Sequence, residues 1–185
     1  MIAYHLDRYS SLSAGQILNL EPFHYEMGFQ NMNFNTLAHN LSLIGFDSIS
    51  HFGKIMTENV EMDTLPMLTN RYIEFIFEMV RTREFPDMPS RLKCLFSFPT
   101  LSCIKEWSEY LIQSSSPVWE VSCDSESVIT LDARFLRAGD HLHNPDDSVT
   151  YDNARKYWNR ETSPRPLLET LLPLPAKIVR QVSVY

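Results

Sequence analysis

The sequence predicts a single α+β domain. Its 185 residues are enough for one compact domain with a hydrophobic core and too few for two. Segments with helical periodicity alternate along the chain with short, strand-like apolar runs. The glycine-rich patterns GxGxxG and GxxxxGK[ST] are both absent, which argues against a Rossmann or P-loop nucleotide site. We therefore expect residues 1–185 to form one domain in which helices flank small sheets.

Composition narrows the class of protein. Hydrophobic residues make up 44% of the chain and aromatic residues 12%, as in folded globular proteins. The net charge of −7 argues against binding nucleic acid through overall charge, although it leaves room for a local basic groove. Cys94, Cys103 and Cys123 are odd in number and show no CxxC spacing, which predicts reduced thiols rather than a disulfide or zinc site.

Neither a membrane segment nor a signal peptide is expected. No apolar run approaches the roughly 20 residues that a helix needs to cross a bilayer. The first residues, MIAYHLDR, lack a basic region followed by a long apolar core. These features predict a cytoplasmic protein without a membrane partner.

The N-terminal third combines a clear strand with a poorly patterned stretch. Residues 2–6 (IAYHL) predict a strand with His5 at its centre. The hydroxyls that follow predict a capped short helix over residues 10–18. Residues 19–68 have weak periodicity, although the spacing of apolar residues predicts a helix over 37–44.

The strongest helix is predicted to begin near Leu68, with Thr69 or Asn70 as its cap, and to end before Pro86. It has a wide apolar face, and we expect its charged side chains in solvent; these are Arg71, Glu74, Glu78 and Arg81. A buried strand is predicted at residues 92–98. Later elements follow from the same patterns: a helix after Thr100, strands at 118–123 and 128–131, a helix at 150–158, a polar loop at 159–166, and strands at 167–172 and 176–184.

Two charged residues at the predicted strands are candidates for chemistry. Glu169 lies within an apolar strand, where a carboxylate is costly to bury unless it is paired or functional. The alternative is that Glu169 faces solvent on an edge strand. Arg91 enters the middle strand, where its guanidinium would suit a bidentate phosphate contact. The alternative for Arg91 is a structural salt bridge, with Asp87 as the nearest acid.

The histidines carry weaker signals. His5 is placed to bind a ribose hydroxyl, or else to be an ordinary core residue of its strand. His141 and His143 lie in a polar loop and have no third ligand at a useful spacing, so no metal site is predicted.

The order of His, Arg and Glu along the chain resembles the ADP-ribosyltransferase superfamily, and within it the DarT-like enzymes that modify nucleic acid. The chain is also similar to a small family of uncharacterised bacterial and phage proteins associated with that superfamily. The superfamily resemblance is carried by Tyr4-His5 with residues 12–18, by Arg91-Leu92 with residues 95–98, and by residues 168–173 (LETLLP) followed by Ile178. The similarity to the small family is carried by residues 85–98 (FPDMPSRLKCLFSF) with Tyr157-Trp158.

The resemblance implies a fold, a co-substrate and site residues. The fold would be two small packed β-sheets flanked by helices, with NAD bent in the cleft between them. Glu169 and Arg91 would be catalytic: the carboxylate would hold the ribose 2′-hydroxyl and stabilise charge as nicotinamide leaves, and the guanidinium would take a phosphate or the ribose. Cofactor-binding positions would be His5, Tyr4, Arg91, Ser97, Tyr157 and Trp158, the last two by stacking on nicotinamide unless they pack in the core.

The resemblance also bears on the acceptor. Residues 159–166, with Arg160 and Arg165, would form the loop that recognises the substrate, and their charge suits a phosphate backbone. Many protein-modifying relatives carry a second Gln or Glu two residues before the catalytic Glu, a position that is Leu167 here. This departure argues against arginine modification and favours a nucleobase.

The predicted function is therefore NAD-dependent mono-ADP-ribosyl transfer to an RNA or DNA base, as a toxin or phage-conflict enzyme restrained by an antitoxin protein. The alternatives are a protein-directed enzyme of the same class, an inactive nucleotide- or partner-binding module, and an RNA 2′-phosphotransferase, which usually carries more basic residues.

Overall fold

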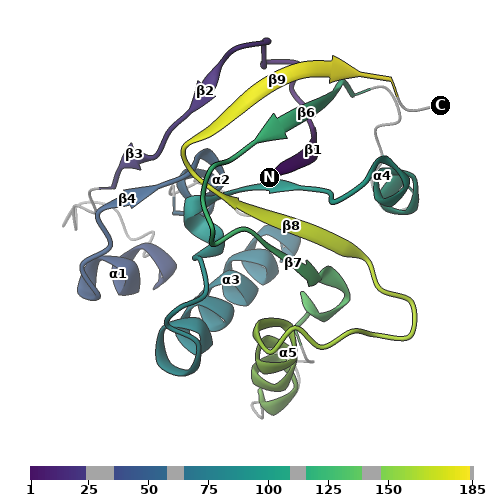
Figure 1. Ribbon diagram of the computed structural model, residues 1–185. Helices are drawn as coiled ribbons and strands as arrows, with labels where there is room; N and C mark the ends of the chain where they lie inside the picture. Colours follow the sequence, from purple (N-terminus) through teal and green to yellow (C-terminus); the bar gives the residue numbers. More distant parts are fainter. Residues whose placement is uncertain (24–35, 58–64, 109–115, 139–146, 184–185) are drawn as a thin grey trace.

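Two antiparallel sheets form the centre of the molecule (Figure 1). The computed structural model describes residues 1–23, 36–57, 65–108, 116–138 and 147–183. The larger sheet has the order β1-β6-β9-β2, and the smaller has the order β5-β8-β7. Their strands are β1 (Ile2–Leu6), β2 (Ile17–Leu18), β5 (Cys94–Ser97), β6 (Val118–Ser122), β7 (Ile129–Asp132), β8 (Leu168–Pro173) and β9 (Ala176–Val182).

The two sheets meet where β1 passes the end of β5. Tyr4 and Phe98 form an antiparallel bridge there, with each backbone N–H donating to the other residue's carbonyl at 2.9 and 2.7 Å. A separate two-stranded sheet pairs β3 (Glu21–Pro22) with β4 (Ser48–Ile49). The α+β class predicted from the sequence is confirmed.

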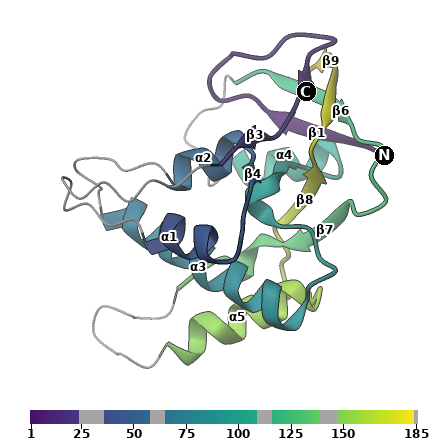
Figure 2. The same cartoon turned by 90° about the vertical axis from the view of Figure 1, so that its left-hand side faces the viewer.

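Helices cover the smaller sheet and the region beside the junction. They are α1 (Thr36–Leu43), α2 (His51–Thr57), α3 (Leu65–Glu84), α4 (Leu101–Ser108) and α5 (Ser148–Trp158), with short 3-10 turns η1 (Arg91–Lys93) and η2 (Ala133–Phe135). Figure 2 shows α1, α2 and α3 to one side of strands β8 and β9. The apolar faces of α3 and α5 pack with β7 and β8 in one core cluster that includes Phe77, Tyr157 and Leu171.

Most predicted elements are confirmed, with small shifts at their ends. Helix α3 begins at Leu65 instead of Leu68, because Pro66 fits the first turn of a helix, where no backbone N–H donor is required. The predicted strand at 92–98 begins with η1, in which the Ser90 hydroxyl accepts a hydrogen bond from the Leu92 backbone N–H.

The helix predicted over residues 10–18 is wrong. The Asp7 carboxylate accepts hydrogen bonds from the backbone N–H groups of Tyr9 and Leu12 and fixes a turn there. Gly15 then adopts a φ of +85°, and its N–H donates to the Ile178 carbonyl of β9. Pairing with this distant strand provides the hydrogen bonds that a local helix would otherwise have supplied.

The three cysteines are free and buried, as expected. Burial raises the pKa of the Cys94 thiol to about 12, so this thiol stays protonated at neutral pH. Among the described residues, no helix combines the length and hydrophobicity that a membrane crossing requires.

Asp132 anchors the loop that leads into β8. Its Oδ1 accepts the backbone N–H groups of Arg134 and Leu167 at 3.0 and 2.9 Å, and its Oδ2 accepts that of Ser163 at 2.7 Å. We expect Asp132→Asn to lower the free energy of unfolding by about 1–3 kcal/mol, because one oxygen is replaced by an amide donor that faces N–H groups. Urea unfolding at pH 7 measures the loss, with Asp152→Asn at an exposed pair with Arg155 as the control.

The contribution of Asp132 to the free energy of unfolding should decrease at low pH. Burial alone would raise the pKa of Asp132, but hydrogen bonds from Ser163, Leu167 and Arg134 outweigh it and lower that pKa below its ordinary value. A lowered folded-state pKa means that the stabilisation is complete above the unfolded-state pKa of about 4 and is lost as the pH falls below it. A difference between wild type and Asp132→Asn that stays constant from pH 7 to pH 2 would contradict this account.

Candidate functional site

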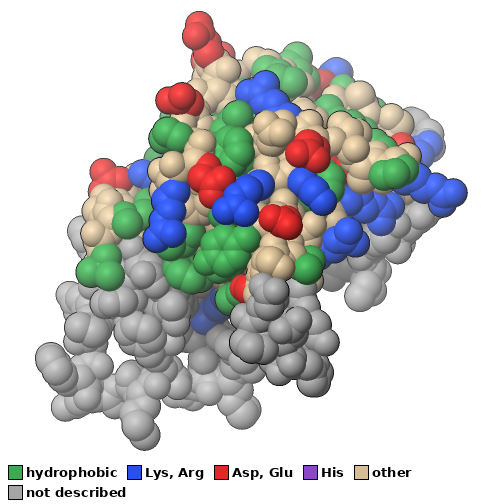
Figure 3. Space-filling model, turned by 90° about the horizontal axis from the view of Figure 1, so that it is seen from below, with side chains coloured by type: hydrophobic (Ala, Val, Ile, Leu, Met, Phe, Trp, Pro, Cys, Tyr) green, Lys and Arg blue, Asp and Glu red, His purple; other side chains and the backbone are tan. Residues whose placement is uncertain are grey.

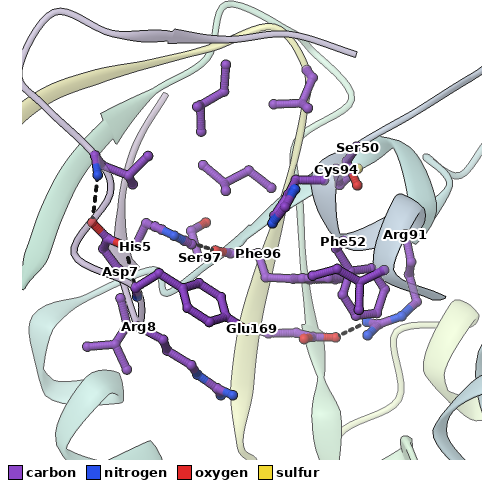
Figure 4. A pocket seen from close by; sticks show the side chains of 18 of the residues that line it. His5, Asp7, Arg8, Ser50, Phe52, Arg91, Cys94, Phe96, Ser97 and Glu169 are labelled. Carbon is purple, nitrogen blue, oxygen red and sulfur yellow. Dashed lines mark hydrogen bonds and ion pairs between the residues drawn. The ribbon is translucent and has the colours of Figure 1, made fainter. Parts of the chain in front are cut away.

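A pocket of about 810 Å³ lies beside the junction of the two sheets (Figure 4). Its wall comes from β1 and the turn after it, from α2 and α3, from η1 and β5, and from the start of β8. His5, Arg91 and Glu169 all line this pocket, although Arg91 and Glu169 are 78 residues apart in the sequence. The fold thus brings the three predicted residues to one cavity.

Arg91 is buried and binds two carboxylates. Its Nη1 donates to Oε1 of Glu169, and also to the Tyr157 hydroxyl at 2.5 Å. Its Nε and Nη2 donate to Glu74, with distances of 3.0 and 3.1 Å to Oε2 and Oε1. The ring of Phe96 lies 4.6 Å from the guanidinium carbon. The structural salt bridge that was the alternative role of Arg91 is present, but the suggested partner Asp87 is wrong. The partners are Glu74 of α3 and Glu169 of β8.

The guanidinium of Arg91 and its two carboxylates stabilise each other's charges, whereas the two carboxylates repel each other. Burial alone would lower the pKa of Arg91, but the carboxylates of Glu169 and Glu74 outweigh it and raise that pKa well above its ordinary value. Burial raises the pKa of Glu74, an effect that Arg91 opposes. Because two carboxylates already bind the Arg91 guanidinium, a contact between it and a ligand phosphate does not fit this geometry.

Glu169 is held by one of its two carboxylate oxygens. It lies on β8, the central strand of the smaller sheet, so the alternative of an exposed residue on an edge strand is wrong. Oε1 accepts from Arg91 and, at 2.6 Å, from the Tyr157 hydroxyl. Within the described parts of the chain, no group hydrogen-bonds to Oε2 of Glu169, which leaves that oxygen for a ligand.

Tyr157 and Trp158 are both fully buried at the end of α5. The Trp158 indole N–H donates to the Phe77 carbonyl at 2.8 Å, and its ring packs in the core cluster of α3 and α5. The predicted stacking of Trp158 on a ligand is therefore wrong, because its ring faces are covered by core side chains. Tyr157 does not line the pocket and reaches Glu169 through its hydroxyl; burial raises its pKa well above the ordinary value, so the hydroxyl remains a donor.

His5 faces the pocket and its neighbour Tyr4 does not. Nδ1 of His5 lies 2.7 Å from the Phe96 carbonyl, and because a carbonyl only accepts, Nδ1 carries the proton. Burial lowers the pKa of His5, so the neutral ring presents Nε2 as an acceptor at pH 7. Tyr4 packs against the core cluster of Phe98 and Val118 and is not among the residues that line the pocket, so the structure does not place it at the candidate site.

Of the remaining predicted residues, one lines the pocket and the two arginines do not. Ser97 lines the pocket, but its hydroxyl donates to the Thr170 carbonyl at 2.9 Å. Arg160 and Arg165 are exposed on the loop after α5, and neither lines the pocket. Figure 3 shows basic side chains interspersed with acidic ones on the lower face of the molecule. His141 and His143 lie outside the described residues, among which no group of three His, Cys, Asp or Glu side chains is suited to hold a metal.

Sequence reasoning missed two residues of the site. Glu74 was expected in solvent, yet it is buried, lines the pocket and binds Arg91. Periodicity could not have revealed this, because Glu74 shares the polar stripe of α3 with Arg71 and Glu78, a pattern that is typical of a solvated helix face. Arg8, two residues after the end of β1, also lines the pocket; it is exposed and forms no hydrogen bond or ion pair with the described residues. Figure 4 shows its side chain extending toward the space beside Glu169.

Comparison with known proteins finds a relative that matches part of the chain and a family that matches nearly all of it. Nonribosomal peptide synthetase 8 of Aspergillus fumigatus (strain ATCC MYA-4609 / CBS 101355 / FGSC A1100 / Af293) is 39% identical over 72 residues, which are 37% of this chain. The chain spans about 1% of the length of that curated relative. The family described as "Protein of unknown function (DUF2441)" matches residues 3–184, which is nearly the whole chain. The protein therefore belongs to the DUF2441 family.

Proposed function

We propose that this protein is an NAD-dependent mono-ADP-ribosyltransferase that modifies a nucleic-acid base in the cytoplasm. The observation that carries the proposal is the convergence of His5, Arg91 and Glu169 on one pocket beside the junction of two small sheets. The volume of about 810 Å³ lies within the range of about 300–1,000 Å³ that is typical of small-molecule sites. The order of the three residues is the one on which the resemblance rests.

The free oxygen of Glu169 is suited to the central role. Oε2 would accept a hydrogen bond from the 2′-hydroxyl of the ribose, while Arg91 and Tyr157 hold Oε1 in place. NAD would supply the bond that breaks, since the electron pair of the ribose–nicotinamide bond leaves with nicotinamide and the acceptor bonds to the same carbon and loses a proton. The fixed carboxylate would stabilise the positive charge that develops on the ribose ring. Nε2 of His5 would accept from a second hydroxyl or from the amide of the ligand.

Arg8 is suited to bind the diphosphate of NAD, a role that the paired guanidinium of Arg91 cannot fill. We expect Arg8→Gln to raise the KM for NAD about 10- to 100-fold and to leave kcat nearly unchanged, because a charge-assisted phosphate contact is worth about 1.5–3 kcal/mol. Steady-state kinetics of NAD consumption measure both constants. Arg83→Gln, an exposed arginine of α3 that does not line the pocket, is the control. An unchanged KM in Arg8→Gln would place the diphosphate elsewhere.

Two features bear on the acceptor. Leu167, two residues before Glu169, is buried, so that position provides no second polar group to engage a protein side chain. Arg160 and Arg165 expose positive charge on the loop that enters β8, where a phosphate backbone would meet it. Both features support nucleic acid over protein as the acceptor of ADP-ribose.

A module that binds a nucleotide without catalysis is the second candidate. The double pairing of Arg91 with Glu74 and Glu169 favours it, because a closed ion network also serves as a structural element. Thermal unfolding with and without NAD, combined with an assay of nicotinamide release, separates the candidates. Stabilisation without nicotinamide release would support the binding module.

Incubation with labelled NAD tests the proposed function directly. The protein is mixed with separate pools of RNA, DNA and protein, and the label in each pool is counted after removal of free NAD. We expect label in one nucleic-acid pool, together with released nicotinamide. Label in the protein pool would assign a protein acceptor, and no label with no nicotinamide release would overturn the proposal.

A further inference from the structure

The two acids that share Arg91 bind it in different ways. Both oxygens of Glu74 face the edge of the guanidinium formed by Nε and Nη2, at 3.0–3.2 Å. Of the guanidinium nitrogens only Nη1 donates to Glu169, and it does so at Oε1, which also accepts from the Tyr157 hydroxyl. Arg91 is thus bidentate toward Glu74 and monodentate toward Glu169. Among the residues that the structure describes, Oε2 of Glu169 has no hydrogen-bond partner, and Glu169 lines the pocket.

How Arg91 divides its N–H groups between Glu74 and Glu169 would depend on competition between these two acids. A bidentate pair is the strongest arrangement of a guanidinium and a carboxylate, and a buried arginine requires partners for its N–H groups. If Glu74 were neutral, Glu169 would be the remaining charged partner of Arg91. The guanidinium would then gain most by turning a full edge to Glu169, and this would occupy Oε2.

We propose that Glu74 is a positioning residue that keeps Oε2 of Glu169 free by binding the other edge of Arg91. Glu74 acts through Arg91, and Arg91 acts on the orientation of the Glu169 carboxylate. The inference rests on the proposed function for its catalytic consequence, whereas its geometric part stands on the network alone.

Helix α3 offers a matched control. Glu78 is buried four residues after Glu74, accepts from Arg81 at 2.8 and 3.1 Å and from the Ser90 hydroxyl at 3.0 Å, and does not line the pocket. Glu74→Gln and Glu78→Gln therefore make the same chemical change at similar burial, and both remove a charged partner of an arginine.

Kinetics and crystallography test the inference together. We expect Glu74→Gln to lower kcat for NAD about 10- to 100-fold with KM within about twofold of wild type. Glu78→Gln should keep both constants. In the crystal structure of Glu74→Gln we expect Arg91 to contact both oxygens of Glu169, whereas Glu78→Gln should retain a single contact. A wild-type kcat in Glu74→Gln, or an Arg91 that has not moved, would overturn the inference.

A second variant, Glu74→Asp, tests the inference if Glu74→Gln does not fold. Glu74→Asp keeps the charge but shortens the side chain, so it should weaken the bidentate contact and lower kcat in the same direction with KM retained. Full kcat in Glu74→Asp would overturn the inference. If wild-type protein releases no nicotinamide, the proposed function fails, and the position of Arg91 in the crystal structure of Glu74→Gln or Glu74→Asp still decides the geometric claim.

Discussion

Glu169→Gln is expected to abolish most NAD turnover while the protein stays folded. The substitution keeps the shape of the side chain and removes the negative charge that would stabilise the ribose cation. Loss of one fixed electrostatic contact to a transition state costs about 10²–10³-fold in kcat. Nicotinamide release under saturating NAD measures the effect. Arg91 keeps its bidentate partner Glu74 in this variant, so the guanidinium is not left without a counter-charge.

Glu120→Gln is the appropriate control for that experiment. Glu120 is also a buried acid on a central strand, β6, and accepts from Arg180 at 2.9 and 3.2 Å, but it does not line the pocket. It should retain wild-type turnover. Wild-type turnover in Glu169→Gln would remove Glu169 from the chemistry, and equal losses in both variants would indicate damage to the fold instead.

Local patterns predicted most of the fold. The strand at residues 2–6, the helix before Gly45, the long helix ending before Pro86 and the final pair of strands all have patterns that depend on near neighbours. The wrong helix at 10–18 shows the limit, because its residues are hydrogen-bonded to β9, about 160 residues later. Single-sequence periodicity carries no information about such a partner.

The sequence predicted the residues of the site better than the contacts that these residues make. Glu169 was identified because a carboxylate in an apolar strand is costly, but only the strand order shows that β8 is central. The partners of Arg91 are Glu74 on α3 and Glu169 on β8, and a search limited to neighbouring acids gives Asp87. Tertiary packing also decides that His5 lines the pocket and that its neighbour Tyr4 does not.

Arg91→Met is expected to cause the largest loss of stability among the variants considered. It would leave the carboxylates of Glu74 and Glu169 buried without a counter-charge, and breaking a buried ion pair in this way costs about 3–5 kcal/mol. Urea unfolding at pH 7 measures the change in the free energy of unfolding. Arg180→Met is the control, because that side chain is 70% exposed in its pair with Glu120 and its loss should cost less than about 1 kcal/mol.

The penalty in Arg91→Met should shrink in acid. Burial already raises the pKa of Glu74 while Arg91 opposes it, so removal of the guanidinium would raise that pKa further. A raised folded-state pKa means that the cost is complete at high pH and is relieved as the pH falls toward the unfolded-state value of about 4.3. The triple variant Glu74→Gln, Arg91→Met and Glu169→Gln should recover much of the stability at pH 7, because it removes the uncompensated charges. A triple variant as unstable as Arg91→Met would mean that side-chain packing, and not charge, makes Arg91 necessary.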